Sequence, residues 1–258
     1  MMGMVLGDIA GSKWEFKQVD SYYFDGIELF QRDSFFTDDT VMACATKYAI
    51  LNQINYADAY KLFYKMFPNY SYGLRFHRWL ASNNSKSYGS YGNGSAMRVG
   101  FIGEYFKSEE QVIEQATQSA ICTHDHVEGI KGAVGTAMCT FYSKNGKEKN
   151  YIKDYIKSEL QYQLYSSLDE LKEATKNDFC KETCQESMPV SLSCFLLSNN
   201  YEDCLRKILS VNCDTDTCGC IAGGIAENFY GKTGLENDEI ISKYIKSTFL
   251  MDMVRRQI

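Results

Sequence analysis

The stretch Val41-Met42-Ala43-Cys44-Ala45-Thr46-Lys47-Tyr48-Ala49-Ile50-Leu51 decides the fold class of this chain. Within it, apolar residues recur at steps of three and four, as they do on one face of an α-helix. A second stretch, from Ile130 to Phe141, repeats this period at Val134, Ala137 and Met138. Both stretches predict helices with apolar faces turned toward a core.

Outside these two stretches, the sequence predicts more helices and few strands. It contains only two prolines, and alternating apolar stretches of the kind that form half-buried strands are scarce. We expect further helices at Tyr60 to Met66, Gln111 to Ala120, Tyr151 to Tyr165, Tyr201 to Leu209 and Ile240 to Met253. The polar stretch from Ser143 to Asn150 is typical of a surface loop. At 258 residues, the chain fits one all-α domain over residues 1–258.

Composition excludes several classes of protein. Hydrophobic residues make up 45% and charged residues 23%, which is ordinary for a globular domain and argues against disorder. The net charge of -6 argues against a basic surface that binds nucleic acid non-specifically. No apolar run approaches the roughly 18 residues that span a bilayer. We therefore expect a soluble, cytoplasmic protein with no membrane partner.

Ten cysteines are present, but their positions follow no disulfide pairing pattern, so we expect reduced thiols. The tightest group is Cys213, Cys218 and Cys220, which lacks the C-x-x-C spacing of a zinc knuckle. We expect most cysteines to be small core residues.

Two short acidic segments are the candidates for chemistry. Thr37-Asp38-Asp39-Thr40 lies directly before the first helical stretch, and Asp214-Thr215-Asp216-Thr217 lies before an apolar stretch rich in small residues. Each one alone is typical of a helix cap, because Thr and Asp side chains accept hydrogen bonds from free N–H groups. Brought together, they would form an oxygen ligand set suited to Mg²⁺ or Mn²⁺ rather than zinc. Carboxylates about 4 Å apart repel by roughly 1 to 4 kcal/mol, which calls for cations.

Five segments, in this order along the chain, resemble the ADP-ribosylglycohydrolase family. They are Gly7-Asp8-Ile9-Ala10-Gly11-Ser12-Lys13-Trp14-Glu15, Thr37-Asp38-Asp39-Thr40, Tyr91-Gly92-Asn93-Gly94-Ser95-Ala96-Met97-Arg98, Thr123-His124 and Asp214-Thr215-Asp216-Thr217. The resemblance implies a single-domain orthogonal helical bundle with two divalent cations, Mg²⁺ or Mn²⁺, in a binuclear metal cleft. It implies as metal ligands Thr37, Asp38, Asp39, Asp214, Asp216 and Thr217.

The resemblance also assigns residues to substrate and catalysis. Ser90 and Gly92-Asn93-Gly94 would contact phosphates and ribose, because glycines let backbone N–H groups approach anionic oxygens. His124 would line the nucleotide pocket, and Asp38 or Glu15 would direct the attacking water. The alternatives are an ordinary turn for the glycines, a packed or capping residue for His124, and an exposed helix-surface acid for Glu15.

The implied reaction is hydrolysis of the glycosidic bond at C1″ of an ADP-ribosylated protein or small molecule, with release of ADP-ribose. One alternative is a protein that binds ADP-ribose, or serves structurally, without turnover; the intact acids favour the enzyme. A metal-dependent phosphoesterase is another. One departure from the family pattern precedes the second acidic segment: Asn212 and Cys213 stand where two glycines are usual. We expect metal binding to survive this change and the leaving-group pocket to differ.

Overall fold

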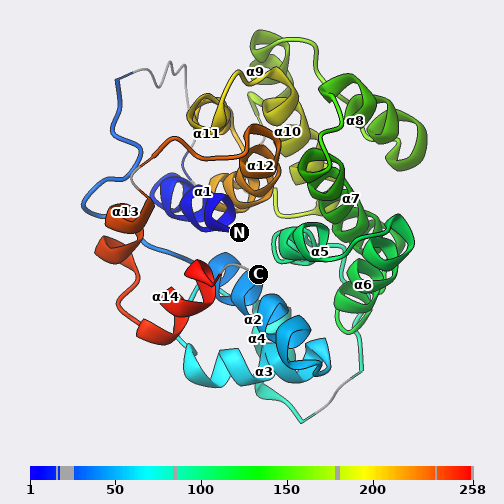
Figure 1. Cartoon of the computed structure of the whole chain (residues 1–258), viewed down its shortest axis with the longest axis vertical. Helices are drawn as coiled ribbons and strands as arrows, with labels where there is room; N and C mark the ends of the chain where they lie inside the picture. The colour runs from blue at the N-terminus through cyan, green and yellow to red at the C-terminus, as the bar shows by residue number, and fades with distance from the viewer. Residues whose placement is uncertain (16, 18–25, 84–85, 178–180, 236, 257–258) are drawn as a thin grey trace.

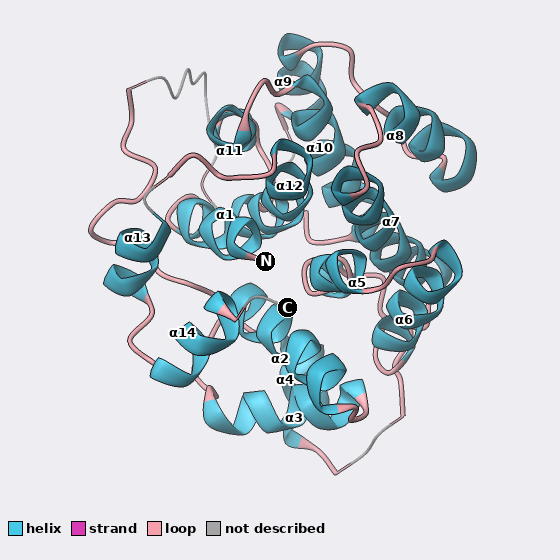
Figure 2. Ribbon diagram, in the orientation of Figure 1, coloured by secondary structure: helices cyan, strands magenta, loops and turns pink. Residues whose placement is uncertain are grey.

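The computed structural model describes residues 1–15, 17, 26–83, 86–177, 181–235 and 237–256. Among these residues the regular elements are helices, and no strand is formed, which confirms the predicted all-α class (Figure 2). The α-helices are α1 (Met2–Ser12), α2 (Asp38–Asn52), α3 (Tyr56–Met66), α4 (Leu74–Ala81), α5 (Gly100–Tyr105), α6 (Glu109–Ile121), α7 (Val127–Lys144), α8 (Lys149–Tyr155), α9 (Leu168–Thr175), α10 (Cys184–Leu197), α11 (Tyr201–Leu209), α12 (Thr215–Tyr230), α13 (Asn237–Tyr244) and α14 (Thr248–Arg255). A 3₁₀-helix, η1 (Asn93–Ser95), and a π-helix, η2 (Ile156–Leu160), complete the set.

Most predicted helices are present. The two periodic stretches lie in α2 and α7, and α11 has the predicted bounds. Several predictions were wrong in their limits. The loop predicted from Ser143 to Asn150 covers only residues 145–148, because α7 continues to Lys144 and α8 begins at Lys149, and α3 begins at Tyr56 rather than Tyr60. The helical segment that begins at α8 ends with η2 at Leu160 instead of reaching Tyr165, because the backbone of Gln161 turns into the left-handed region. The predicted helix from Ile240 to Met253 is two helices, because the Ser247 side chain caps a new helix, α14.

Helices α1 and α12 lie side by side in the interior of the molecule (Figure 1), and the order of the contacts between them shows that they run antiparallel. Their backbones touch through glycines: a methyl group on Gly7 would lie 2.0 Å from the carbonyl oxygen of Gly219. Gly3 meets Gly223 in the same way, and Gly11 meets Thr215. Because no side chains separate the two helices here, the end of α1 and the start of α12 lie side by side.

The other helices surround this pair. Helix α12 contacts α2, α5, α7, α10 and α11, and every residue from Thr215 to Ala226 is buried. This burial is consistent with the many small residues, Gly, Ala and Cys, in this part of α12. None of the helices in the described part of the chain combines the length and apolarity needed to cross a bilayer.

Candidate active site

The start of α2 is fixed by Asp8, a buried carboxylate on α1. Asp8 accepts hydrogen bonds from the backbone nitrogen of Thr37 at 3.0 Å and from its hydroxyl at 2.9 Å. It also accepts one from the backbone nitrogen of Thr40 at 3.1 Å. The Thr37 hydroxyl in turn accepts from the Asp39 nitrogen at 3.2 Å, as an N-cap. Asp8 therefore ties α1 to the acidic segment of α2.

Asp8 was not among the predicted site residues, although it lies in the first segment that resembles the family. A single acid in a stretch of small apolar residues carries no spacing signal. The signal that could have found it is its expected burial, because a buried carboxylate requires hydrogen-bond donors. Thr37 and Thr40, which flank the first acid pair, supply them.

The start of α12 is held differently. Asp214 occupies the N-cap position, but its side chain makes no capping hydrogen bond. Its Oδ2 instead accepts a hydrogen bond of 2.7 Å from the side-chain amide of Asn93, which also donates to the Ser187 hydroxyl at 2.8 Å. The simple capping interpretation therefore fits Thr37 but not Asp214, whose carboxylate is held by Asn93 instead.

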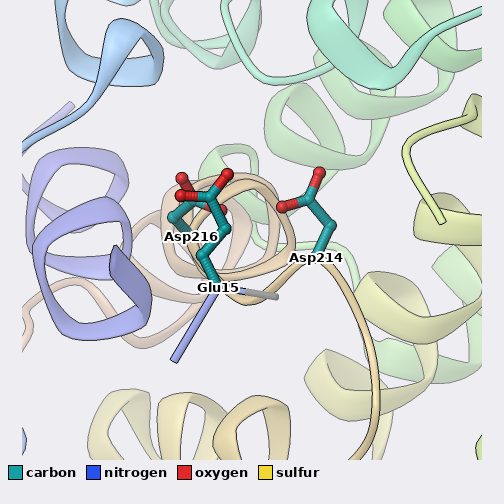
Figure 3. Close-up of side chains that lie close together, drawn as sticks. All are labelled: Glu15, Asp214 and Asp216. Atoms are coloured by element: carbon teal, nitrogen blue, oxygen red, sulfur yellow. The ribbon is translucent and has the colours of Figure 1, made fainter. Parts of the chain in front are cut away.

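The fold brings the two acidic segments together. The Thr217 hydroxyl donates to Oδ1 of Asp39 at 3.3 Å, across 178 residues of sequence. Carboxylate oxygens of Glu15, Asp214 and Asp216 lie within 4.8 Å of one another, and Figure 3 shows their side chains converging above the start of α12. Glu15, which the sequence placed among the catalytic residues, thus also offers a ligand atom for a cation.

Negative charge accumulates at this point. Burial raises the pKa of Asp38 and Asp39 well above the usual range, and the nearby charges of Asp216 and Asp8 raise it further. Burial and the charge of Asp216 raise the pKa of Glu15 to about 8. Burial, and then the charge of Asp214, raise the pKa of Asp216 well above its usual range as well. The carboxylates therefore need protons or cations to coexist at neutral pH.

The oxygen atoms at the site fit a hard divalent cation. Oδ2 of Asp39 is buried and has no hydrogen-bond partner among the described residues, which is costly unless an ion or ligand compensates it. The Thr37 hydroxyl donates its proton to Asp8 and accepts a hydrogen bond from the Asp39 nitrogen with one lone pair. Its second lone pair remains available for a cation. Carboxylate and hydroxyl oxygens are ligands that Mg²⁺ and Mn²⁺ prefer.

The predicted substrate-binding residues form a second group beside the acids. A methyl group on Gly94 would lie 3.3 Å from Nε2 of His124, and one on Gly92 would lie 3.6 Å from it. The backbone nitrogen of Ser90 donates to the carbonyl oxygen of Thr123 at 3.3 Å, and its hydroxyl accepts from the Gly92 nitrogen at 3.2 Å. Ser90, Gly92, Gly94 and His124 therefore lie together.

His124 is buried and lies in the loop between α6 and α7, with Nδ1 2.7 Å from the Thr123 hydroxyl. Burial lowers its pKa well below the usual range, and the nearby Arg98 and Arg75 lower it further, so the ring is neutral at pH 7. His126 is exposed, and its side chain caps α7 by accepting a hydrogen bond from the Glu128 nitrogen. Its capping role is that of a structural histidine.

Asn93 joins the two groups. It belongs to the glycine-rich segment that was expected to contact phosphate and ribose, but its side chain reaches Asp214 and Ser187. Its backbone nitrogen donates to the Glu182 carbonyl oxygen at 2.9 Å. A cavity of about 1210 Å³ lies elsewhere, with Lys47, Glu104 and Arg256 among its lining residues and none of the predicted ones. The contacts above, rather than that cavity, define the site.

Comparison with known proteins places this chain in a family. The family model for ADP-ribosylglycohydrolase matches residues 1–246. ADP-ribosylhydrolase ARH3 from Homo sapiens is 26% identical over 90% of this chain and 84% of that protein. ARH3 from Bos taurus is 27% identical over 76% of this chain and 70% of that protein.

The fold has a solved counterpart. A structure described as an ADP-ribosylglycohydrolase-related protein complex superimposes with a TM-score of 0.72 at 17% identity, covering 98% of this chain and 93% of that chain. At this identity the match shows the shared fold. Because the family model covers nearly the whole chain, the chain belongs to the ADP-ribosylglycohydrolase family.

Proposed function

We propose that this protein is a metal-dependent hydrolase that cleaves the glycosidic bond at C1″ of ADP-ribosylated substrates and releases ADP-ribose. The observation that carries the proposal is the convergence of Glu15, Asp214 and Asp216 with the Asp39–Thr217 contact. The family and the relatives named as ADP-ribosylhydrolases support hydrolysis of an ADP-ribosyl bond.

The proposed metal-holding residues come from the starts of two helices. Thr37, Asp38 and Asp39 would contribute from α2, and Asp214, Asp216 and Thr217 from α12. Glu15 is within reach of the second group. When bound, two divalent cations would neutralise these carboxylates, orient the ribose hydroxyls and supply Lewis acidity.

The chain's own residues would do three further things. Asp38 or Glu15 would accept the proton of the attacking water, because both are carboxylates close to the proposed ligand Asp216. His124, being neutral, would hydrogen-bond the nucleotide without adding charge. Ser90 and the glycines at positions 92 and 94 would hold phosphate oxygens through hydroxyl and backbone N–H groups. Asn93 would keep Asp214 oriented toward the reaction centre.

The experiment is a panel of ADP-ribosylated substrates, with the ribosyl group on arginine, serine, a nucleobase or a small metabolite, assayed with Mg²⁺ or Mn²⁺. Chromatography of the products should show free ADP-ribose from at least one substrate. Release of inorganic phosphate or AMP instead would identify a phosphoesterase. Tight binding of ADP-ribose with no turnover of any substrate would identify a binding protein, and either result would contradict the proposal.

A further inference from the structure

Arg98 is a buried cation that the predicted site does not explain. Its side chain is fully buried, and two of its nitrogens, Nε and Nη1, have no hydrogen-bond partner among the described residues. No carboxylate in that part of the chain forms an ion pair with it. Its guanidinium carbon lies 4.3 Å from the centroid of the Tyr60 ring and 5.6 Å from that of Phe76. Because burying a charge with so few partners is costly, the remaining contacts of Arg98 call for an explanation.

The remaining contacts of Arg98 lead to His124. Its Nη2 donates to the Ser119 carbonyl oxygen at 2.7 Å and to the Thr123 hydroxyl at 3.1 Å. The oxygen of the same hydroxyl lies 2.7 Å from Nδ1 of His124. Arg98 and Thr123 lie in two of the segments that resemble the family, but neither is among the predicted site residues. The side chains of Arg98, Thr123 and His124 thus form one hydrogen-bond relay.

The direction of each hydrogen bond in the relay follows from the groups that make it. A guanidinium has donors only, so the Thr123 hydroxyl accepts from Arg98 and keeps its own proton to donate. The acceptor for that proton is Nδ1 of His124 at 2.7 Å, since the Cys122 sulfur lies 4.0 Å away and accepts weakly. The positive charge of Arg98, one hydroxyl away, also favours a lone pair over an N–H at Nδ1. A neutral imidazole that accepts at Nδ1 carries its proton on Nε2.

Nε2 of His124 faces the segment that is expected to hold the substrate. A methyl group on Gly94 would lie 3.3 Å from it, and Nε2 itself has no hydrogen-bond partner in the described part of the chain. The ring packs against Phe76 and Tyr88, with centroids 6.5 and 6.2 Å away. Because ionised phosphate oxygens only accept hydrogen bonds, a proton on Nε2 suits such a ligand, whereas a lone pair there would repel it.

We propose that Thr123, oriented by Arg98, is a positioning residue that fixes His124 as the Nε2–H tautomer, so that the buried ring donates a hydrogen bond to a phosphate oxygen of the ADP-ribosyl group. Without the Thr123 hydroxyl, the ring is free to carry its proton on either nitrogen. The Nδ1–H form loses the bond to the phosphate and turns a lone pair toward it. The role in substrate binding rests on the proposed function, whereas the tautomer does not.

Nuclear magnetic resonance of the whole protein, labelled with ¹⁵N, reads the tautomer directly. The chain has three histidines, and His77→Gln and His126→Gln identify the signals of His124 by elimination. At neutral pH, His124 should show a protonated Nε2 and an unprotonated Nδ1. A proton on Nδ1, on both nitrogens or exchanging between them in the wild type would overturn the proposal.

The role of the hydroxyl is tested by two substitutions of one residue. Thr123→Val removes the hydroxyl at nearly constant shape and should give a mixture of tautomers, with ADP-ribose binding weakened about tenfold and Mg²⁺ affinity unchanged in calorimetry. Thr123→Ser returns the hydroxyl without the methyl group and should restore both the tautomer and the affinity. Equal loss of ADP-ribose affinity in Thr123→Val and Thr123→Ser would mean that methyl packing holds His124, and would overturn the proposal.

Two further variants separate the relay from general effects of losing a buried polar group. The control Thr140→Val removes a buried hydroxyl that donates to the Thr136 carbonyl oxygen at 2.8 Å. It should change neither the tautomer nor ADP-ribose affinity, and a loss equal to that of Thr123→Val would overturn the proposal. Arg98→Met removes the donor to Thr123 and should release the proton as Thr123→Val does. A pure Nε2–H tautomer in folded Arg98→Met would exclude Arg98 from the relay; if this variant does not fold, the two Thr123 variants decide. If the wild type binds no ADP-ribose, the proposed function fails, while the spectrum of His124 still decides the tautomer.

Discussion

At the scale of single residues, the site depends on side chains that repel one another. Asp39 and Asp216 belong to different helices, and the charge of Asp216 helps to raise the pKa of both Asp38 and Asp39. Such an arrangement lowers the free energy of unfolding unless a bound cation neutralises the charges, because like charges 4 Å apart repel by roughly 1 to 4 kcal/mol. The acids should therefore matter for function more than for stability.

Removing either acid tests this expectation. Asp39→Ala and Asp216→Ala should each lower the rate of hydrolysis at least about 100-fold. Mutating even the residues that only hydrogen-bond to metal ligands typically lowers metal affinity or activity about 10- to 100-fold. Without metal, both variants should melt no earlier than the wild type, because a repulsive charge is gone. Asp154→Ala, which removes an exposed acid of α8, is the control. Wild-type turnover in either variant at limiting metal would show that the two-helix site is wrong.

His124 tests the nucleotide side of the site. His124→Ala should weaken ADP-ribose binding about tenfold, or about 1.4 kcal/mol, while leaving Mg²⁺ affinity unchanged. The control is His126→Ala, which removes an exposed cap two residues away and should cost only about 1 kcal/mol of stability. Calorimetry with Mg²⁺ first and ADP-ribose second separates the two affinities. Loss of Mg²⁺ binding with retained ADP-ribose binding would reverse the assignment of His124.

At the scale of elements, the antiparallel contact of α1 and α12 positions the acids. Gly7→Ala places a methyl group 2.0 Å from the Gly219 carbonyl oxygen, so the helices must move apart. We expect a loss of about 1 to 3 kcal/mol or more and a melting temperature lower by roughly 2 to 4 °C per kcal/mol. Gly73→Ala, where an added methyl group meets no atom within 4 Å, should change stability by less than about 0.5 kcal/mol.

Calorimetric melting of the two glycine variants, each without and with Mg²⁺, is the measurement. Gly7→Ala should also bind Mg²⁺ more weakly, because Asp8 follows Gly7 and orients the start of α2. Equal stability of the two variants would mean that the close approach of α1 and α12 is not required.

The sequence predicted helices best where one face is apolar. Helix α11 has buried residues on one face and charged residues on the other, and its bounds were found. Helices α1 and α12 are buried on nearly all sides. They therefore lack the alternation of apolar and polar faces by which a helix is recognised in a sequence. The break between α13 and α14 was missed because neither Gly nor Pro marks it; a serine cap does.

The acids were predictable for a different reason. The four acids lie in two short motifs, T-D-D-T at residues 37–40 and D-T-D-T at residues 214–217, which can be recognised directly in the sequence. The bond between Asn93 and Asp214 joins residues 121 positions apart, and no local pattern encodes it. The same holds for Asp8, whose partners follow 29 and 32 positions later. Local motifs thus identify residues, whereas the packing of α1 on α12 decides which of them meet.

At the scale of the whole molecule, the site joins segments that lie far apart in the sequence. Its acids come from the first 39 residues and from the start of α12, so metal binding should hold α1, α2 and α12 together. A cation that binds only the folded state adds about 2.7 kcal/mol at a hundredfold excess over its dissociation constant. We expect Mg²⁺ to raise the melting temperature by roughly 5 to 11 °C. Scanning calorimetry with and without chelator measures this shift, which should disappear in Asp216→Ala.

The most direct test of the central claim is the initial rate of ADP-ribose release from one substrate that the protein cleaves. The rate is measured before chelation, after thorough removal of divalent cations, and again after Mg²⁺ or Mn²⁺ is restored. The account predicts that turnover falls to background after chelation and returns with the cation. Undiminished release of ADP-ribose from the cation-free protein would contradict it.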